Sequence, residues 1–505
     1  MTKETPTGIT VIIVGLGIAG LTAAIECHRQ GHKVIGLEKK STVYQLGNHL
    51  AERHGWSCLG DIIGLSENGL NVFSHWPTTN GSSIASTLAS LGSELASVDI
   101  FSDAGELKYT IPFGADSPVA GQFLRRSDLV QVLYQYATTD LGLDLRYGVM
   151  VEEYWETATM AGVLLQGGER ISGQCVIGAD GAHSKARAII TGETPAESAA
   201  AVVETGGAMF RSTFDASAVA TDPDAQWVLQ GASTHDRHEI YFGKDVTILM
   251  GTIGQGKYDL TKATTNWVQT ASPTPVLRYI QDWGVAKRLS AVIGKTPQGT
   301  CFNHSLITRK PLRTWVSRQA RMIVIGDAAH QFLPHTGQGA NQAIEDAAVL
   351  AICLRLASLS NDPSGCEEDG VPLALRVMEK LRQDLDQPSL LERILTSTSR
   401  HKRVSLVQQG SIEAQEVTLE ADLDHGTSAD RFNAISRPAW IHCHDCISHT
   451  HQEFHRAAEV LTKGDGNSNA YIPTNAPVDG GFHAEDDYIL LGKGGGQGDV
   501  KQEIV

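Results

Sequence analysis

Glycine, proline and acidic residues gather in the stretch GDAAHQFLPHTGQGANQAIEDAAVL at residues 326–350. Asp327 follows a short apolar run, where its carboxylate could accept hydrogen bonds from a polyol. Pro334 stiffens the next loop, Gly337 and Gly339 leave its N–H groups bare, and an alanine-rich helix is expected to follow. The positive end of that helix would point at whatever lies over the loop. A reduced flavin carries negative charge on one edge of its ring, so this stretch predicts a loop that holds an isoalloxazine.

A second glycine cluster, GLGIAG, places Gly15, Gly17 and Gly20 directly after an apolar run at residues 9–14. In a strand–turn–helix unit the first glycine permits the tight turn, the second lets a pyrophosphate approach the backbone, and the third lets the helix pack on the strand. The phosphate would lie at a helix N-terminus, where free N–H groups favour an anion. The strand before this motif and the helical pattern after it favour a dinucleotide site over a glycine-rich turn without a ligand.

An acidic residue, Glu38, ends the next predicted strand at 33–38 and lies 18 residues after Gly20. Its carboxylate can accept hydrogen bonds from both hydroxyls of an unphosphorylated ribose and would repel a 2′-phosphate. The nucleotide is therefore expected to be FAD or NAD rather than NADP.

A third segment, VIGADGAHSKAR at 176–187, places Asp180 and Gly181 at a predicted strand end. The carboxylate could bind ribose or ribityl hydroxyls, or brace a loop near the pyrophosphate. The same pair could also form an ordinary turn.

The elements that position these residues predict an α/β fold. We expect a Rossmann-like FAD-binding domain, interleaved with a mixed-sheet substrate domain and followed by a helical C-terminal region. Strand-like runs such as HEIYFG and VTILMG, separated by turn signals, indicate the mixed sheet. The expected ranges are 1–200 (FAD-binding domain, first part, with inserted substrate-domain segments), 201–305 (substrate domain), 306–360 (FAD-binding domain, second part), 375–460 (helical region) and 461–505 (mobile tail).

Bulk composition excludes several other classes of protein. The 505 residues carry a net charge of −16, which disfavours nucleic acid or anionic lipid as a partner. The longest apolar run, at 11–25, is too short for a membrane span, and the N-terminus shows no signal-peptide pattern. The 8 cysteines are scattered, so a reducing, cytoplasmic location is expected.

Taken together, the segments GLGIAG…E, GADGxxSxxR and GDAAHxxxPxxGQGxNxAIEDAxxL resemble those of the single-component flavoprotein monooxygenases. This is the family of para-hydroxybenzoate and salicylate hydroxylases, and the likeness is strongest to its fungal branch. The resemblance covers about residues 9–355, and its third motif is highly specific. Two lesser stretches are also similar, GDIIGLSENGLNVFSHW at 60–76 and RRSDLVQVL at 125–133.

The resemblance implies roles for further residues. Arg126 would contact the flavin or its diphosphate, Asp327 would bind the ribityl chain, and the Asp180–Gly181 segment would serve both FAD and NAD(P)H. The other implied cofactor-binding positions are Gly60, Pro334, Gly337, Gly339, Ala340 and Asn341, the last three against the ring.

The implied reaction consumes NAD(P)H and dioxygen. In the family, NAD(P)H reduces FAD, dioxygen adds to give a flavin C4a-hydroperoxide, and an oxygen atom passes to a small-molecule substrate. An electron-rich aromatic or indolic natural product would be hydroxylated, and epoxidation of an alkene on the same fold is the alternative. The nicotinamide cofactor visits a surface without its own Rossmann domain, which agrees with the single GxGxxG unit.

Two departures concern the substrate pocket and the loop over FAD. The stretch between Glu38 and Gly60 is longer than usual, and Met250-Gly251 replaces the family's frequent Tyr-Pro. Fungal relatives that hydroxylate phenols hold the phenolate with an Arg and a Tyr. By position Arg211 and Tyr241 are the candidates for these catalytic roles, although each could instead be structural.

The segment HCHDCISHTHQEFH at 442–455 contains two cysteines and five histidines. Its CxxC resembles half of a zinc site, but a second CxxC or an H-x3–5-H pair at zinc-finger distance is absent, although His451 and His455 are four residues apart and could share a helix face. We therefore favour a helix with surface histidines and expect no metal. WIHCHD is also similar to a W-x-x-x-x-D element of the fungal branch.

Two other functions compete with a monooxygenase. A flavin halogenase shares the fold but carries a WxWxIP stretch that this chain lacks. A non-catalytic flavin- or metal-binding interaction protein would use the His/Cys segment as its active part, and would bind zinc without NAD(P)H turnover.

Overall fold

The computed structural model describes most of the chain up to residue 382 and parts of the C-terminal region. The described residues are 5–41, 62–79, 81–112, 121–243, 246–254, 258–266, 272–298, 301–309, 311–359, 370–382, 404, 407–408, 411 and 439–463.

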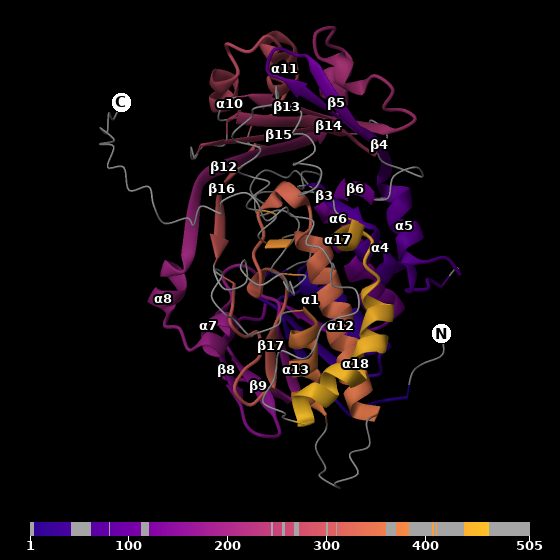
Figure 1. Ribbon diagram of the computed structural model, residues 1–505, viewed down its shortest axis with the longest axis vertical. Helices are drawn as coiled ribbons and strands as arrows, with labels where there is room; N and C mark the ends of the chain where they lie inside the picture. The colour runs from indigo at the N-terminus through magenta and orange to yellow at the C-terminus, as the bar shows by residue number, and fades with distance from the viewer. Residues whose placement is uncertain are drawn as a thin grey trace, which may run out of the picture.

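A five-stranded parallel sheet forms the lower half of the molecule in Figure 1. Its strands run in the order β17-β11-β1-β2-β7, and every neighbouring pair is parallel. They are β1 (Thr10–Val14), β2 (Lys33–Glu38), β7 (Asp144–Tyr147), β11 (Cys175–Gly178) and β17 (Met322–Val324). Since the carboxyl ends of parallel strands meet at one edge, the sheet brings together loops that are far apart in the sequence.

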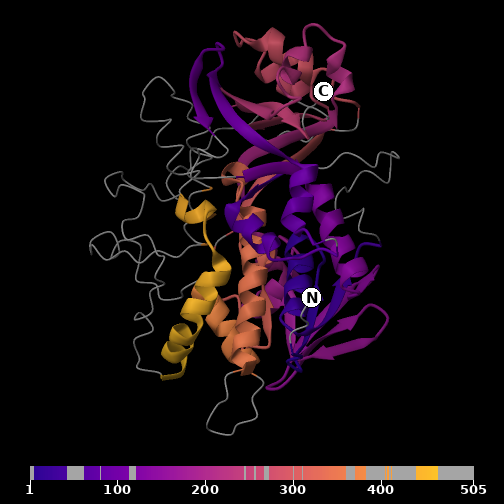
Figure 2. The same cartoon turned by 90° about the vertical axis from the view of Figure 1, so that its right-hand side faces the viewer.

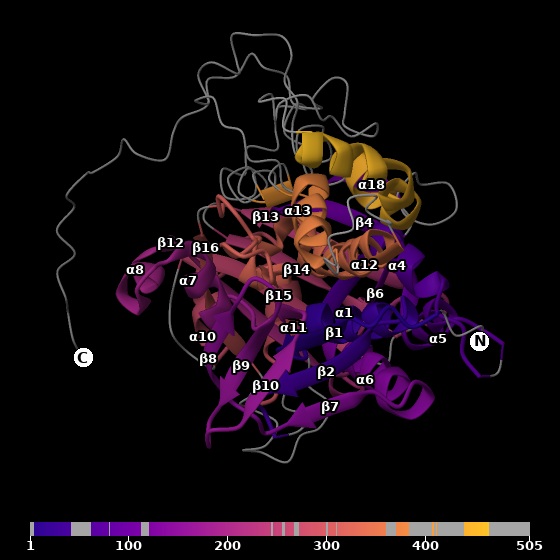
Figure 3. The same ribbon diagram turned by 90° about the horizontal axis from the view of Figure 1, so that it is seen from below.

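Four helices form layers beside this sheet. Helix α1 (Ile18–Arg29) packs on β1 and β2, and the long helix α12 (Gly339–Leu359) packs on α1. Two C-terminal helices, α13 (Val371–Arg382) and α18 (Cys446–Lys463), pack against α12. Figure 3 shows them on the side of α12 away from α1. Helix α12 is therefore buried on most sides, which explains its alanine-rich composition.

A second, mixed sheet forms the upper half of the molecule (Figures 1 and 2). Its order is β16-β12-β15-β14-β13-β4-β6-β3, with β5 paired to β4. Its strands are β3 (Ile62–Ser66), β4 (Ser93–Ser102), β5 (Leu107–Pro112), β6 (Gly121–Arg125), β12 (Val202–Asp215), β13 (Asp236–Gly243), β14 (Val246–Ile253), β15 (Tyr258–Asn266) and β16 (Phe302–Arg309). One face packs on α11 (Ala286–Ile293) and α10 (Thr274–Tyr279) through its own apolar core. The other face is turned toward the parallel sheet.

The remaining elements connect and cover these layers. A small antiparallel sheet, β8 (Val151–Glu156), β9 (Ala161–Leu165) and β10 (Arg170–Gly173), lies between β7 and β11 in the chain. The other helices are α4 (Glu67–Ser74), α5 (Ile84–Leu91), α6 (Arg126–Gln135), α7 (Lys185–Thr191), α8 (Pro195–Ala200), α9 (Ser217–Ala220) and α17 (Ala439–His442).

This architecture confirms the predicted fold class. The βαβ unit begins at Thr10, and β3 to β6 of the mixed sheet are inserted before α6 returns the chain to the parallel sheet. The helix expected after the glycine turn begins at Gly339. In the part of the chain that the structure describes, no helix is both long enough and apolar enough to cross a membrane.

Candidate active site

A cavity of about 520 Å³ lies between the two sheets. We call the side formed by loops at the carboxyl edge of the parallel sheet the cavity floor. It includes Gly17, Arg126, Gly181, Asp327, Pro334, Gly337, Gly339 and Ala340. We call the side formed by the mixed sheet the cavity roof. It includes Val98, Ile111, Phe123, Met209, Arg211, His238, Ile240, Phe242, Thr247 and Leu249.

The glycine loop after β1 is shaped by contacts that exclude side chains. A Cβ on Gly15, whose φ is +92°, would lie 2.5 Å from the Ala179 carbonyl oxygen, and a Cβ on Gly20 would lie 1.8 Å from the Gly15 carbonyl oxygen. A Cβ on Gly17 would meet nothing within 4 Å. Gly17 instead borders the cavity at the start of α1, where unpaired N–H groups favour a phosphate. The loop thus has the open cradle that a dinucleotide diphosphate requires.

Glu38 lies at the end of β2 beside this loop. Its carboxylate is buried, and it accepts hydrogen bonds from the backbone N–H groups of Leu16 (2.8 Å) and Lys40 (3.0 Å). These contacts fix the carboxylate next to the glycine loop, in the position expected for a ribose acceptor. That role remains a prediction.

An opposite-charge pair stands on the floor. Asp327 follows β17, and Arg126 begins α6. Burial raises the pKa of Asp327, while the neighbouring charges of His330 and Arg126 lower it in part. Burial likewise lowers the pKa of Arg126, and Asp327 opposes that shift. The pair offers an acceptor for a ribityl hydroxyl beside a cation for a phosphate or a flavin carbonyl.

Asp180 and Gly181 follow β11 on the same edge of the sheet. Oδ2 of Asp180 accepts from the Lys185 N–H (2.9 Å) and the Tyr154 hydroxyl (3.5 Å). Oδ1 is buried and has no hydrogen-bond partner among the described residues. Burial raises the pKa of this carboxyl group, although several hydrogen bonds lower it. A buried acceptor of this kind fits the hydroxyl groups of FAD.

The roof supplies one cation among mostly apolar side chains. Arg211 lies on β12 and lines the cavity. Burial lowers its pKa to about 10, so the guanidinium stays protonated at neutral pH. The structure therefore brings Arg211 into the same cavity as the floor residues.

The structure does not bring Tyr241 into this cavity. Side chains alternate between the two faces of a strand, so His238, Ile240 and Phe242 of β13 face the cavity while Tyr241 faces the outer core. The Tyr241 hydroxyl donates to Glu239 at 2.5 Å, and its ring stacks on Phe101. Burial raises the pKa of Tyr241. The catalytic role expected for Tyr241 does not agree with this position.

Asn341 also differs from expectation. It is buried, and its side chain bonds to the backbone of Ser66, Gly64 and Gly337 at 3.0–3.1 Å. Asn341 therefore ties β3 to the start of α12 rather than lining the cavity. Gly60 lies outside the described residues.

Three histidines that the sequence did not indicate as site residues line the cavity: His238, His335 and His442. Burial lowers the pKa of His335 to about 4. The signal for His335 was its place inside the third motif, between Pro334 and Gly337. For His442 the only signal was the W-x-x-x-x-D element. Among the described residues, no three His, Cys, Asp or Glu side chains form a metal-binding group.

The fold and the cavity are those expected of a flavoprotein, and the GxGxxG loop and the strand-end residues Glu38, Asp180 and Asp327 are predicted to surround FAD. Two family models described as FAD binding domain match the chain, at residues 10–58 and 120–361.

Relatives of known type give the class of enzyme. The chain is 45% identical to notoamide E oxidase notB of Aspergillus sp. (strain MF297-2) over 490 residues, 96% of each protein. It is 40% identical to FAD-dependent monooxygenase notI of the same organism over 471 residues, 93% of this chain and 97% of notI. The crystal structure of CtdE in complex with FAD and substrate 4 has 35% identity and a TM-score of 0.75, and it covers 90% of this chain and 100% of CtdE. The chain belongs to the FAD-dependent monooxygenases, and its cofactor is FAD.

Proposed function

We propose that this enzyme hydroxylates an electron-rich aromatic or indolic natural product at the expense of NAD(P)H and dioxygen. The observation that carries the proposal is the placement of one arginine among the described roof residues, Arg211, between mostly apolar side chains and opposite the floor. The likeness to notoamide E oxidase and to CtdE, which binds FAD and a substrate, supports a natural product of similar size and chemistry.

FAD, when bound, supplies the hydride acceptor and the activation of dioxygen. The floor and the strand ends beside it would hold FAD: the N–H groups at Gly17 would face the diphosphate, and Asp180 and Asp327 would accept from its hydroxyl groups. The start of α12 would present the positive end of the helix to the flavin ring, where it would stabilise negative charge.

The roof residues orient the substrate. Phe123, Ile240 and Phe242 give flat, water-excluding walls against which an aromatic ring can pack. Arg211 donates hydrogen bonds to a phenolate, a carbonyl or a developing alkoxide on the substrate, and its charge favours the anionic form. In this arrangement the electron-rich ring of the substrate would lie toward the floor, with its polar edge at Arg211.

Absorption spectroscopy and product analysis test the proposal. Purified protein should show the two-peaked flavin spectrum, which should bleach on anaerobic addition of NADPH or NADH, with substrate added in case it gates reduction. Aerobic turnover with a panel of indole alkaloids should then add one oxygen atom, detected by mass spectrometry. Formation of an epoxide, identified by hydrolysis to a diol, would instead support the alternative reaction, epoxidation of an alkene. Oxygen consumption that yields only hydrogen peroxide with every indolic substrate would contradict the proposed substrate class.

A further inference from the structure

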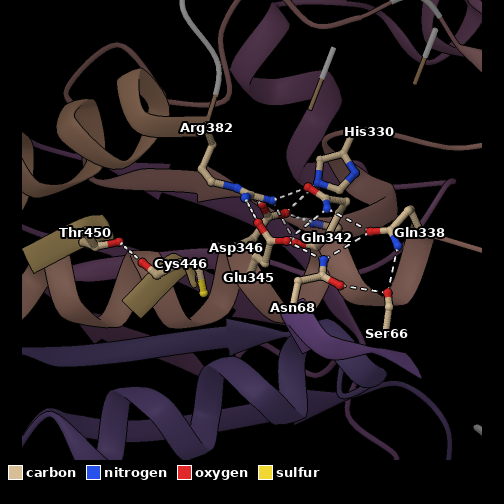
Figure 4. Close-up of polar contacts among 11 residues, drawn as sticks. Ser66, Asn68, His330, Gln338, Gln342, Glu345, Asp346, Arg382, Cys446 and Thr450 are labelled. Atoms are coloured by element: carbon tan, nitrogen blue, oxygen red, sulfur yellow. Dashed lines mark hydrogen bonds and ion pairs between the residues drawn. The ribbon is translucent and has the colours of Figure 1, made fainter. Parts of the chain in front are cut away.

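A buried polar network lies directly beneath the cavity floor (Figure 4). It begins at Arg382 of α13, whose guanidinium is paired with Glu345 and with Asp346 of α12, the latter at 2.8 Å. All three side chains are at most 2% exposed. The network continues through Gln342, Gln338, Asn68 and Ser66, which are also buried. It reaches the cavity floor at Gln338, which lies between Gly337 and Gly339.

Arg382 fixes the direction of every hydrogen bond that follows. Arginine can only donate, and its Nη2 bonds the side-chain Oε1 of Gln342 at 2.9 Å. The Gln342 amide nitrogen must therefore point the other way, where it donates to Oε1 of Gln338 at 3.1 Å. The carboxamide orientation of Gln338 is then fixed as well, with its Nε2 directed away from Gln342.

A second route through the network, from Glu345 through Asn68 to Gln338, gives the same orientation of the Gln338 carboxamide. Asn68 donates its amide nitrogen to the Glu345 carboxylate, which can only accept, and to Oε1 of Gln338 at 3.2 Å. Ser66 donates its hydroxyl to Oδ1 of Asn68 at 2.8 Å. The Ser66 oxygen is thereby left to accept from Nε2 of Gln338 at 2.9 Å.

One proton of Gln338 remains, and it meets a histidine from the C-terminal region. Nε2 of Gln338 lies 3.0 Å from Nδ1 of His442, which belongs to α17 and lines the cavity. Because Gln338 donates here, Nδ1 of His442 must accept, and the ring proton must lie on Nε2. The tautomer of His442 thus follows from the charge of Arg382, through two intervening side chains, Gln342 and Gln338.

We propose that His442 is a positioning residue for FAD: by accepting from Gln338 through Nδ1, it holds the Gly337–Gly339 turn in its FAD-binding conformation. The His/Cys segment of the C-terminal region then belongs to the active site and needs no metal for this role. Without an acceptor at this point, a buried Gln338 N–H would lose its partner, which favours a rotated carboxamide and a displaced turn.

Substitutions at His442 distinguish a role of Nδ1 from a role of Nε2. In His442→Asn, the side-chain oxygen can take the place of Nδ1, so the acceptor for Gln338 is retained. In His442→Gln, the amide lies one atom farther along, at the place of Nε2, and in His442→Leu no acceptor remains. His451→Asn serves as the matched control, because His451 is exposed on α18 in the same segment.

The measurement is the FAD dissociation constant of each full-length apoprotein, from flavin fluorescence titration, together with the melting temperature of the apoprotein. We expect His442→Asn and His451→Asn to bind FAD as the original protein does, and His442→Gln and His442→Leu to bind it about tenfold more weakly, which is the usual effect of one unpaired buried donor.

Equal FAD affinity in all four variants would overturn the inference. So would a loss of affinity that follows only the melting temperature, with no rescue in His442→Asn. The inference does not depend on the substrate, since the readout is FAD binding. A protein that binds FAD in this pattern but oxidises no indolic substrate would contradict the proposed function alone.

Discussion

At the scale of single residues, the cavity places the side chains predicted to hold FAD on one side and those predicted to hold the substrate on the other. Asp327 lies on the floor with Arg126 beside it, and Arg211 lies on the roof. Substitutions at these positions should therefore fail in different ways.

Asp327→Ala should yield folded protein with little bound flavin. The substitution removes an acceptor for FAD and leaves the charge of Arg126 uncompensated. The ratio of flavin to protein absorbance after purification measures the effect, with the exposed Asp224→Ala as control. Full FAD occupancy in Asp327→Ala would remove Asp327 from the cofactor site.

Arg211→Ala should retain FAD and lose product. The loss of one buried charged donor on the substrate is expected to lower kcat/KM about 10²–10³-fold. Steady-state turnover at matched FAD occupancy measures this. Unchanged product formation would mean that the roof does not orient substrate through Arg211.

Tyr241→Phe should lower the stability of the fold and leave turnover unchanged. The Tyr241 hydroxyl donates to Glu239 on the face of the sheet away from the cavity, where Arg288 also binds this carboxylate. Turnover should be unchanged, while the free energy of unfolding falls by about 1–2 kcal/mol through loss of one buried hydrogen bond. Denaturant unfolding and turnover of the same preparation test both halves, and a large loss of turnover with unchanged stability would restore a catalytic role.

At the scale of elements, α12 connects the floor to the C-terminal helices through buried charge. Arg382→Met should destabilise the protein by about 3–5 kcal/mol, because it leaves Glu345 and Asp346 buried without their cation. Urea unfolding measures the change. Arg456→Ala, which breaks a pair on α18 whose arginine is 47% exposed, should cost less than about 1 kcal/mol. Equal effects of the two substitutions would show that the buried network does not stabilise the fold.

The sequence predicted the secondary-structure elements well, but it did not show which face of a strand meets the cavity. The strand–glycine–helix unit, the strand-end Asp residues and the turn before α12 are local patterns, so the fold class and the FAD cofactor could be predicted and are confirmed. The resemblance makes Tyr241 a candidate by its position in the sequence, but position alone does not show which face of strand β13 meets the cavity. A register error of one residue reverses that assignment.

Other contacts could not be predicted from local patterns at all. Gln338 and His442 are 104 residues apart. Nothing near either residue indicates the other, because the contact exists only after α17 has packed beside α4. The buried network, with partners in β3, α4, α12, α13 and α17, is likewise a product of tertiary packing.

At the scale of the whole molecule, the N-terminal segment and α12 are joined by a buried histidine. His32 has its Nδ1 2.7 Å from the Thr7 hydroxyl and its Nε2 3.3 Å from the Ala351 carbonyl oxygen. Burial lowers the pKa of His32 to about 4, so the folded protein keeps it neutral.

Acid should therefore weaken the fold through His32. The unfolded chain takes up a proton near pH 6.5 and the folded chain only near pH 4, so stability is complete above about pH 6.5 and declines toward pH 4. The loss from this one residue should be about 3 kcal/mol. Denaturant unfolding across this range should show a shallower decline for His32→Gln than for the original protein. Parallel curves would assign the acid sensitivity to other groups.

The insertion of β3 to β6 before α6 has a consequence for exchanging parts between relatives. The roof is encoded in two separate pieces, one ending at β6 and one running from β12 to β16. A cassette that carries only the second piece would pair donor strand β13 with recipient strand β4, since these two are neighbours in the sheet. Its pocket would then be a hybrid, with Val98 and Phe123 from one parent and Arg211 and His238 from the other. To transfer substrate preference between such enzymes, both pieces must therefore be exchanged together, so that β4 and β13 come from the same parent.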